Sequence, residues 1–164
     1  MTFLHQRGTT TSRSCGPPFP KLLRINIHST RKRGAVPGRK NKNRRRVLII
    51  DDNRSVAHSL ATLIRALGHE SMYVDDPVKA LDAARAFLPD IAFLALAMPT
   101  MDGYTLVRVL KAHKELKGLY LVALMGLGRP ERPERYLEAG FDLQVRKPVD
   151  ADAVKEIFAQ LAKR

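Results

Sequence analysis

The sequence predicts one doubly wound α/β domain, in which helices cover both faces of a five-stranded parallel sheet. Residues 47–164 contain five short apolar runs that are continuous rather than alternating, as expected for strands covered on both faces. Segments with the apolar spacing of helices separate these runs and follow the last one. Strand–helix repetition of this kind favours right-handed crossovers between parallel strands. The segment is long enough for one hydrophobic core and too short for two.

The five strands are predicted from apolar runs of different strength. The first, residues 47–50, is rich in β-branched side chains and stops at Asp51-Asp52-Asn53. Residues 91–98 and 119–125 form two further strong runs, and residues 72–74 and 143–145 form two weaker ones. Each run is short enough for an ordinary strand.

The five helices are predicted from apolar stripes and from the residues that bound them. Gly68 closes the first helix, Pro77 and Pro89 enclose the second, and Gly140 ends the short fourth. Asp150 is the expected N-cap of the fifth. In chain order the stripes are Val56, Leu60, Leu63, Ile64 and Leu67; Val78, Leu81, Ala84 and Leu88; Leu106, Val107 and Leu110; residues 133–139; and Val154, Ile157, Phe158 and Leu161.

The charge of the chain is concentrated in an N-terminal arm. The formal net charge is +13, from 29 Lys and Arg against 16 Asp and Glu, and residues 1–46 hold 13 of these basic residues and no acidic one. We assign residues 1–45 to a basic arm whose composition predicts disorder, and residues 46–164 to the domain. Three explanations of the arm stay open: an inert tail or mis-assigned translation start, a nucleic-acid contact, and a targeting sequence.

Composition and spacing exclude several kinds of site. The single cysteine, Cys15, allows no intrachain disulfide and no Cys/His metal cluster. The longest apolar run, residues 91–98, is far short of the roughly 20 residues that span a bilayer. No nucleophile–base set has supporting spacing, and His58, His69 and His113 have no second histidine at ligand spacing. We therefore expect a cytoplasmic protein that does not bind membranes and is not an enzyme.

The residues that follow the predicted strands are the candidates for function. In a doubly wound sheet, ligands bind beyond the carboxyl ends of the strands. The segments at that edge are Asp51-Asp52, residues 95–102, Met125-Gly126 and Lys147-Pro148.

Several ordered motifs at this edge resemble those of one signalling family. They are residues 47–53 (VLIIDDN), residues 89–91 (PDI), residues 98–104 (MPTMDGY), residues 138–142 (EAGFD) and residues 147–150 (KPVD). The pattern resembles the CheY-like receiver domain of two-component response regulators and covers about residues 46–162. This resemblance implies a flavodoxin-like fold with five strands and five helices.

The resemblance also implies a phosphotransfer switch. In that family the first-strand acidic pair and an aspartate ending the third strand bind Mg²⁺, and this aspartate accepts phosphate from a histidine kinase. A Thr or Ser ending the fourth strand and a Lys ending the fifth contact the phosphoryl oxygens. Such chemistry requires a hard cation and hydrogen-bond donors where negative charge develops.

The sequence departs from this pattern at three positions. The acceptor position falls on Ala95, the hydroxyl position on Met125 and the switch-aromatic position on Gln144. An alanine has no oxygen and cannot form an acyl phosphate, so the resemblance is to a degenerate receiver. The retained family residues are Asp51, Asp52, Lys147 and Pro148.

The retained charges leave two explanations open. Lys147 could neutralise Asp51 and Asp52 as a structural ion pair, or the two carboxylates could keep a residual, weak Mg²⁺ site, although no cofactor is required. Asp102 is a conceivable substitute acceptor, but its position before Gly103 favours a helix-capping role.

The functional expectation is a phosphorylation-independent interaction module in two-component or phosphorelay signalling. A histidine kinase, another receiver or an output protein would bind the face formed by the fourth helix, fifth strand and fifth helix, which contains Tyr136. Because the chain stops at Arg164, we expect any effect to be exerted in trans. The alternatives are a working receiver with an unconventional acceptor, and a nucleic-acid binder that acts through residues 1–46.

Overall fold

The computed structural model describes residues 44–126, 128 and 133–163. The predicted disordered arm therefore lies outside the described residues, apart from Arg44 and Arg45. Cys15 and Leu127 lie outside them as well. No helix of the described part is long and apolar enough to cross a membrane.

Five parallel strands form one sheet in the order β2-β1-β3-β4-β5. This arrangement confirms the predicted doubly wound, flavodoxin-like architecture. β2 and β5 are the two edge strands, and the order reverses between β1 and β3. The strands are β1 (Arg46–Ile50), β2 (Glu70–Val74), β3 (Ile91–Ala95), β4 (Tyr120–Met125) and β5 (Leu143–Arg146).

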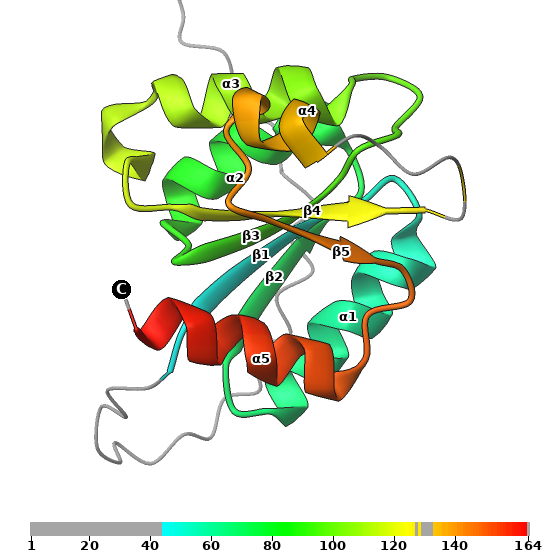
Figure 1. Ribbon diagram of the computed structural model, residues 1–164, viewed down its shortest axis with the longest axis vertical. Coiled ribbons are helices and arrows are strands. Elements are labelled where there is room, and N and C mark those ends of the chain that lie inside the picture. Colours follow the sequence, from blue (N-terminus) through cyan, green and yellow to red (C-terminus); the bar gives the residue numbers. More distant parts are fainter. Residues whose placement is uncertain (1–43, 127, 129–132, 164) are drawn as a thin grey trace, which may run out of the picture.

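The helices form a layer on each side of the sheet. Figure 1 shows α1 and α5 on one face, with α2, α3 and α4 on the other. The α-helices are α1 (Arg54–Ala66), α2 (Ala80–Phe87), α3 (Gly103–Ala112), α4 (Pro133–Ala139) and α5 (Ala151–Ala162), and two short 3₁₀ helices are η1 (Pro77–Lys79) and η2 (Lys114–Leu116).

Alternate side chains of the central strands feed two separate cores. Leu48 and Ile50 of β1 pack with the layer of α2, α3 and α4. Val47 and Ile49 of the same strand pack with α1 and α5. All four side chains are fully buried. Burial on both faces explains why these strands are continuously apolar in sequence.

The third strand ends earlier than its apolar run predicts. β3 stops at Ala95, although the apolar run continues to Met98. The backbone N–H of Gly103 donates to the Leu96 carbonyl oxygen at 3.0 Å and turns the chain back over the strand end. A Cβ at Gly103 would collide with the Ala95 carbonyl oxygen, so glycine is required there. Leu96 and Met98 stay buried in this loop, which explains the long apolar run.

The stripe predicted for the second helix is partly wrong. Val78 and Leu88 are 64% and 48% exposed, whereas Ala80 and Phe87 are buried. Residues 77–79 form a 3₁₀ turn and α2 proper begins at Ala80, which changes the angular phase of the helix. Leu88 follows as a left-handed C-cap with φ of 47°.

Candidate functional site

The carboxyl ends of the strands bring four of the expected residues to one edge of the sheet. Asp51 follows β1, Ala95 ends β3, Met125 ends β4 and Lys147 follows β5. The parallel register places Ala95 beside Leu124, so the ends of β3 and β4 are level. The backbone N–H of Lys147 donates to the Met125 carbonyl oxygen at 2.8 Å, which ties the end of β5 to the end of β4.

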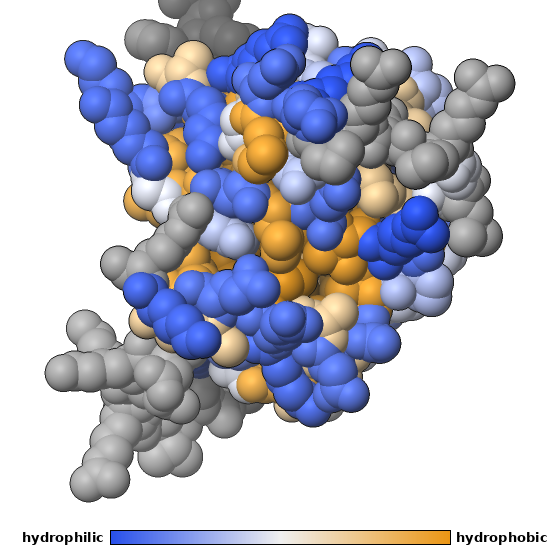
Figure 2. Space-filling model, in the orientation of Figure 1, coloured by the Kyte–Doolittle hydropathy of each residue, from blue (hydrophilic) through white to orange (hydrophobic). Residues whose placement is uncertain are grey.

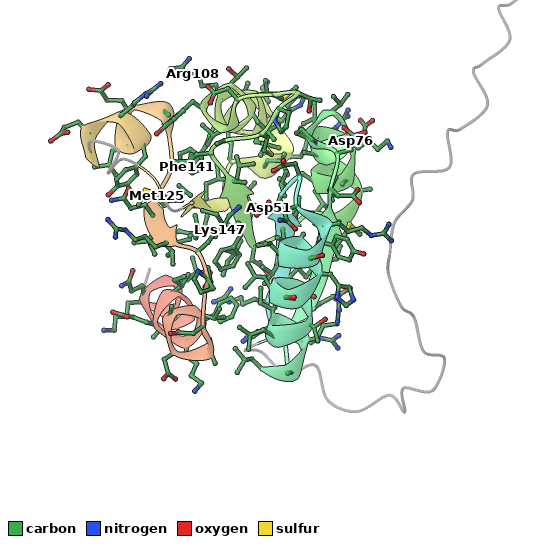
Figure 3. The ribbon with its side chains drawn as sticks, turned by 90° about the vertical axis from the view of Figure 1, so that its right-hand side faces the viewer. Asp51, Asp76, Arg108, Met125, Phe141 and Lys147 are labelled. Carbon is green, nitrogen blue, oxygen red and sulfur yellow. The ribbon has the colours of Figure 1, made fainter. Side chains whose placement is uncertain are left out.

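Asp51 is the one carboxylate at this edge that is fully buried, with 0% of its surface exposed. Its Oδ1 accepts from the backbone N–H of Asn53 at 3.1 Å. The Lys147 ammonium forms an ion pair with Oδ2, and no other group in the described part of the chain donates a hydrogen bond to that oxygen. Figure 3 shows Lys147 and Asp51 side by side at the edge of the sheet. Within residues 44–126, 128 and 133–163, the buried negative charge therefore depends on the Lys147 ammonium.

Asp52 does not join this ion pair. Its side chain is exposed to solvent, and among the described residues Lys147 pairs with Asp51 alone. The predicted pairing of Lys147 with both aspartates is therefore right for Asp51 and wrong for Asp52. Successive residues leave a strand end in different directions, so one carboxylate enters the fold while its neighbour faces water.

The residues present do not form a good Mg²⁺ site. The ion prefers six oxygen ligands in near-octahedral geometry, whereas this edge offers Asp51, already paired, and the exposed Asp52. Within the described residues, no group of three or more His, Cys, Asp or Glu is arranged to hold a metal ion.

Apolar side chains occupy the positions between Asp51 and Lys147. Ala95 is 1% exposed and contributes only a methyl group, and the partly buried Met125 packs against the core beneath α3 and α4. Gln144 of β5 has a buried Oε1 without a hydrogen-bond partner among the described residues. The side chains that end β3 and β4, Ala95 and Met125, therefore supply neither a carboxylate nor a hydroxyl.

The comparisons with known proteins identify the family. The family model of the response regulator receiver domain matches residues 47–159. The chain belongs to the response regulator receiver family. It is 32% identical over 121 residues to the DNA-binding response regulator MtrA of Mycobacterium tuberculosis H37Rv, covering 74% of this chain and 50% of that protein. It is 32% identical over 120 residues to the sensor histidine kinase RcsC of Salmonella typhi, covering 72% of this chain and 12% of RcsC. The chain thus spans half or less of the length of these two relatives.

Solved structures of receivers have the same fold. A CheY-like receiver domain from Methylobacillus flagellatus is similar with a TM-score of 0.65 and 27% identity, covering 72% of this chain and 98% of that one. The chemotaxis protein CheY4 of Vibrio cholerae matches with a TM-score of 0.66 and 20% identity, covering 72% and 98% of the two chains, which shows the fold alone.

The structure also places three other residues that the sequence singled out, Asp102, Asp150 and Pro148. Asp102 occupies the N-cap position of α3, as its predicted capping role requires, but its side chain makes no capping hydrogen bond. Its exposed carboxylate faces solvent while its carbonyl oxygen accepts from Thr105 at 3.0 Å. By contrast, the Asp150 side chain caps α5 by accepting from Ala153 at 2.8 Å, as predicted. The Lys147–Pro148 peptide is cis.

A cavity that the sequence did not predict lies next to Lys147. It has a volume of about 620 Å³ and lies between α1, the end of β4 and the segment before α5. Ser55 and Ser59 line it from α1, one helical turn apart. The only sequence signal was this pair of small polar residues beside an apolar stripe, and the cavity itself forms from segments that are distant in sequence.

Proposed function

We propose that this receiver is a phosphorylation-independent protein-interaction module of two-component signalling that works in the cytoplasm without enzymatic activity. The observation that carries the proposal is Ala95, which ends β3 as a buried methyl group. A methyl group cannot form an acyl phosphate, and in this family's pattern the acceptor falls at this position.

The neighbouring groups support the same proposal. Met125 offers no hydroxyl to a phosphoryl oxygen, and the Lys147 ammonium is already engaged by Asp51. With only two carboxylates, one of them paired, we expect at most weak Mg²⁺ binding and no requirement for the ion. Asp51 and Lys147 then form a structural ion pair in place of a reaction centre.

The face of α4, β5 and α5 is the surface that we propose for partners. Figure 2 shows apolar surface gathered in the hollow between α4 and α5, over β5. Leu143 and Val145 of β5 and Phe158 of α5 are partly buried, whereas Leu137 of α4 is 54% exposed. Tyr136 packs partly against the core, so it contributes to this face only in part. Exposed apolar side chains that gather on one face mark interaction surfaces.

The relatives suggest the classes of partner. RcsC is a sensor histidine kinase and MtrA a DNA-binding response regulator. We therefore propose a histidine kinase, another receiver or an output protein as the partner. Because β5 is an edge strand, its outer side is free of a neighbouring strand in the described part of the chain.

Intact-mass spectrometry after incubation with acetyl phosphate and Mg²⁺ tests the proposal. The wild-type chain should gain no phosphoryl group, because Ala95 lacks the oxygen that attacks phosphorus. Ala95→Asp is the matched variant, since it supplies that carboxylate. A stoichiometric gain of one phosphoryl group by the wild type would overturn the proposal, and peptide mapping would then show whether Asp52 or Asp102 accepts it.

A binding measurement tests the partner surface. Purified histidine kinases and response regulators of the source organism would be screened against the full chain with and without acetyl phosphate. Binding should be the same in both conditions, and Leu137→Glu should weaken it by about tenfold, equal to about 1.4 kcal/mol. Val109→Glu is the control, because Val109 is 36% exposed and belongs to α3, which is not one of the three elements of this face. Binding that requires acetyl phosphate would contradict the proposal.

A further inference from the structure

The cavity beside Lys147 has the size and lining of a small-molecule site. Its volume of about 620 Å³ falls within the range of about 300–1,000 Å³ that is usual for such sites. Its walls are mainly apolar and come from Val56, Leu60, Leu63, Leu124 and Val149. Leu124 and Leu60 are buried in the core below, so the floor is part of the rigid fold.

The polar side chains among the residues that line this cavity all carry hydrogen-bond donors. They belong to Ser55 and Ser59, which have hydroxyls, and to Lys147, which has an ammonium group. No carboxylate of the described residues lines the cavity, and Lys147 is its one charged lining group there. Ser55 is also the second residue of α1, where the helix dipole favours negative charge. The lining thus matches a ligand with an apolar body and an anionic head.

Lys147 remains able to bind the anionic group of such a ligand. Its side chain is 22% exposed, whereas Asp51 is completely buried. An ammonium has three hydrogens, and the ion pair with Asp51 needs only one of them. Both serines are exposed to solvent, and a Cβ at Gly126 of the lining would meet no atom within 4 Å. A ligand can therefore enter from solvent without displacing the buried carboxylate.

We propose that this cavity binds a small amphiphilic anion, with its apolar body against Leu60, Leu63 and Val149 and its head at Ser55, Ser59 and Lys147. None of the residues that line the cavity belongs to α4, β5 or α5, and the cavity can be occupied whether or not that face binds a signalling protein. Occupancy places a second negative group beside the Lys147–Asp51 pair.

Two fluorescent probes test both parts of the proposal on the full chain. 8-Anilino-1-naphthalenesulfonate and N-phenyl-1-naphthylamine share an apolar ring system, but only the first has an anionic group. The sulfonate should bind at one site per chain and about tenfold more tightly than the uncharged probe, a difference of about 1.4 kcal/mol. Equal affinities for the two probes, or no binding of either, would overturn the proposal.

A pair of phenylalanine variants locates the binding. Ser59→Phe fills the cavity from an exposed position and should weaken sulfonate binding by about tenfold or more. Ala66→Phe is the control, since Ala66 is also exposed on α1 but does not line the cavity. Both variants retain the basic residues 1–46, so any sulfonate held by those cations is the same in both.

A third variant keeps the test decisive if Ser59→Phe disturbs the fold. Replacing Ser55 and Ser59 together by alanine removes the two hydroxyls and leaves the apolar wall unchanged. This double variant should lose affinity for the sulfonate and keep its affinity for N-phenyl-1-naphthylamine, with circular dichroism confirming a native fold. If both affinities stay at the wild-type value, the polar end of the proposed site is wrong.

Discussion

The carboxylates at the amino ends of the strands (the amino edge) and at their carboxyl ends (the carboxyl edge) find their partners in different ways. At the amino ends of the strands, Asp90 accepts from the backbone N–H of Arg46 at 2.7 Å. Asp142 accepts from the backbone N–H of Leu121 at 2.9 Å, and Lys111 lies 3.4 Å from the same oxygen. At the carboxyl ends, Asp51 has one backbone donor for Oδ1, and Lys147 alone among the described residues reaches Oδ2.

The carboxylates at the two edges therefore differ in the kind of partner that they need. Each carboxylate at the amino edge accepts a hydrogen bond from the backbone of a neighbouring strand, so its role is to link two strands. Asp51 lies deeper, at 0% exposure. Its partner Lys147 follows β5, and β3 and β4 lie between β5 and β1 in the sheet. A carboxylate in that position needs a cation, and Lys147 supplies it where the wider family uses a metal ion as well. The edges should therefore respond differently to substitution.

The largest effect is expected at the carboxyl edge, from Lys147→Met. Removing the ammonium leaves Asp51 buried without a cation, which costs about 3–5 kcal/mol of unfolding free energy. Adding Asp51→Asn to the same chain should recover most of this loss, because Asn keeps an oxygen for the Asn53 N–H. Urea unfolding of the four chains of this double-mutant cycle measures the coupling.

The control for this cycle is Lys155→Met. Lys155 pairs with Asp152 at 2.9 Å, but these side chains are 60% and 91% exposed. Such a surface pair contributes less than about 1 kcal/mol. If Lys147→Met changed stability no more than Lys155→Met does, Asp51 would not depend on Lys147.

The second effect combines stability with metal binding. Ala95→Asp adds a carboxylate at a position that is 1% exposed, and Lys147 cannot neutralise two aspartates. In metal-free buffer, unfolding free energy should fall by about 2–3 kcal/mol. Mg²⁺ should restore it, because three carboxylates hold the ion better than two. Thermal unfolding against Mg²⁺ concentration measures both effects.

Ala97→Asp is the matched control for that substitution. Ala97 is exposed two residues further along, so a carboxylate there stays in water. It should change neither the stability nor the response to Mg²⁺. A wild-type chain stabilised by Mg²⁺ as strongly as Ala95→Asp would show that Asp51 and Asp52 already form a competent site.

A smaller effect is expected at the amino edge, from Asp142→Ala. The Leu121 N–H loses its acceptor there, which costs about 1–2 kcal/mol for a partly buried donor. Asp142→Asn keeps an acceptor oxygen and should cost less. Urea unfolding distinguishes the two variants, and equal losses would mean that the charge near Lys111 matters more than the hydrogen bond.

Sequence patterns predicted the fold because strands buried on both faces are apolar at every position, as in residues 47–50. The apolar runs also placed Met125 at a strand end and Lys147 just after one, whereas the position of Ala95 came from the resemblance to the receiver pattern, because its run continues to Met98. The sequence patterns failed where local backbone geometry determines how a helix is oriented or where a strand ends. The 3₁₀ turn at Pro77 changed the phase of α2, and the return of Gly103 over Ala95 ended β3 early. The cavity was beyond prediction, because its walls come from α1, β4 and the segment before α5.

The smallest effect concerns pH at the amino edge, where His69 Nδ1 accepts from the Arg45 N–H at 3.2 Å and the ring lies tilted against Phe158. Burial, followed by the charges of Arg45 and Arg44, lowers the pKa of His69 below 6.5. The unfolded chain therefore takes up the proton first, and stability falls as pH drops below about 6.5. The loss should stay below about 1 kcal/mol, because the ring is only partly buried.

The His69→Asn variant isolates this effect. Asn offers an oxygen near the place of Nδ1 but does not titrate, so its unfolding midpoint should change less between about pH 7.5 and about pH 5.5 than that of the wild type. That range stays above the usual titration of carboxylates, which would add their own terms at lower pH. If both chains lost the same stability across it, the hydrogen bond from Arg45 would not depend on the protonation of His69, and the amino edge would be insensitive to pH.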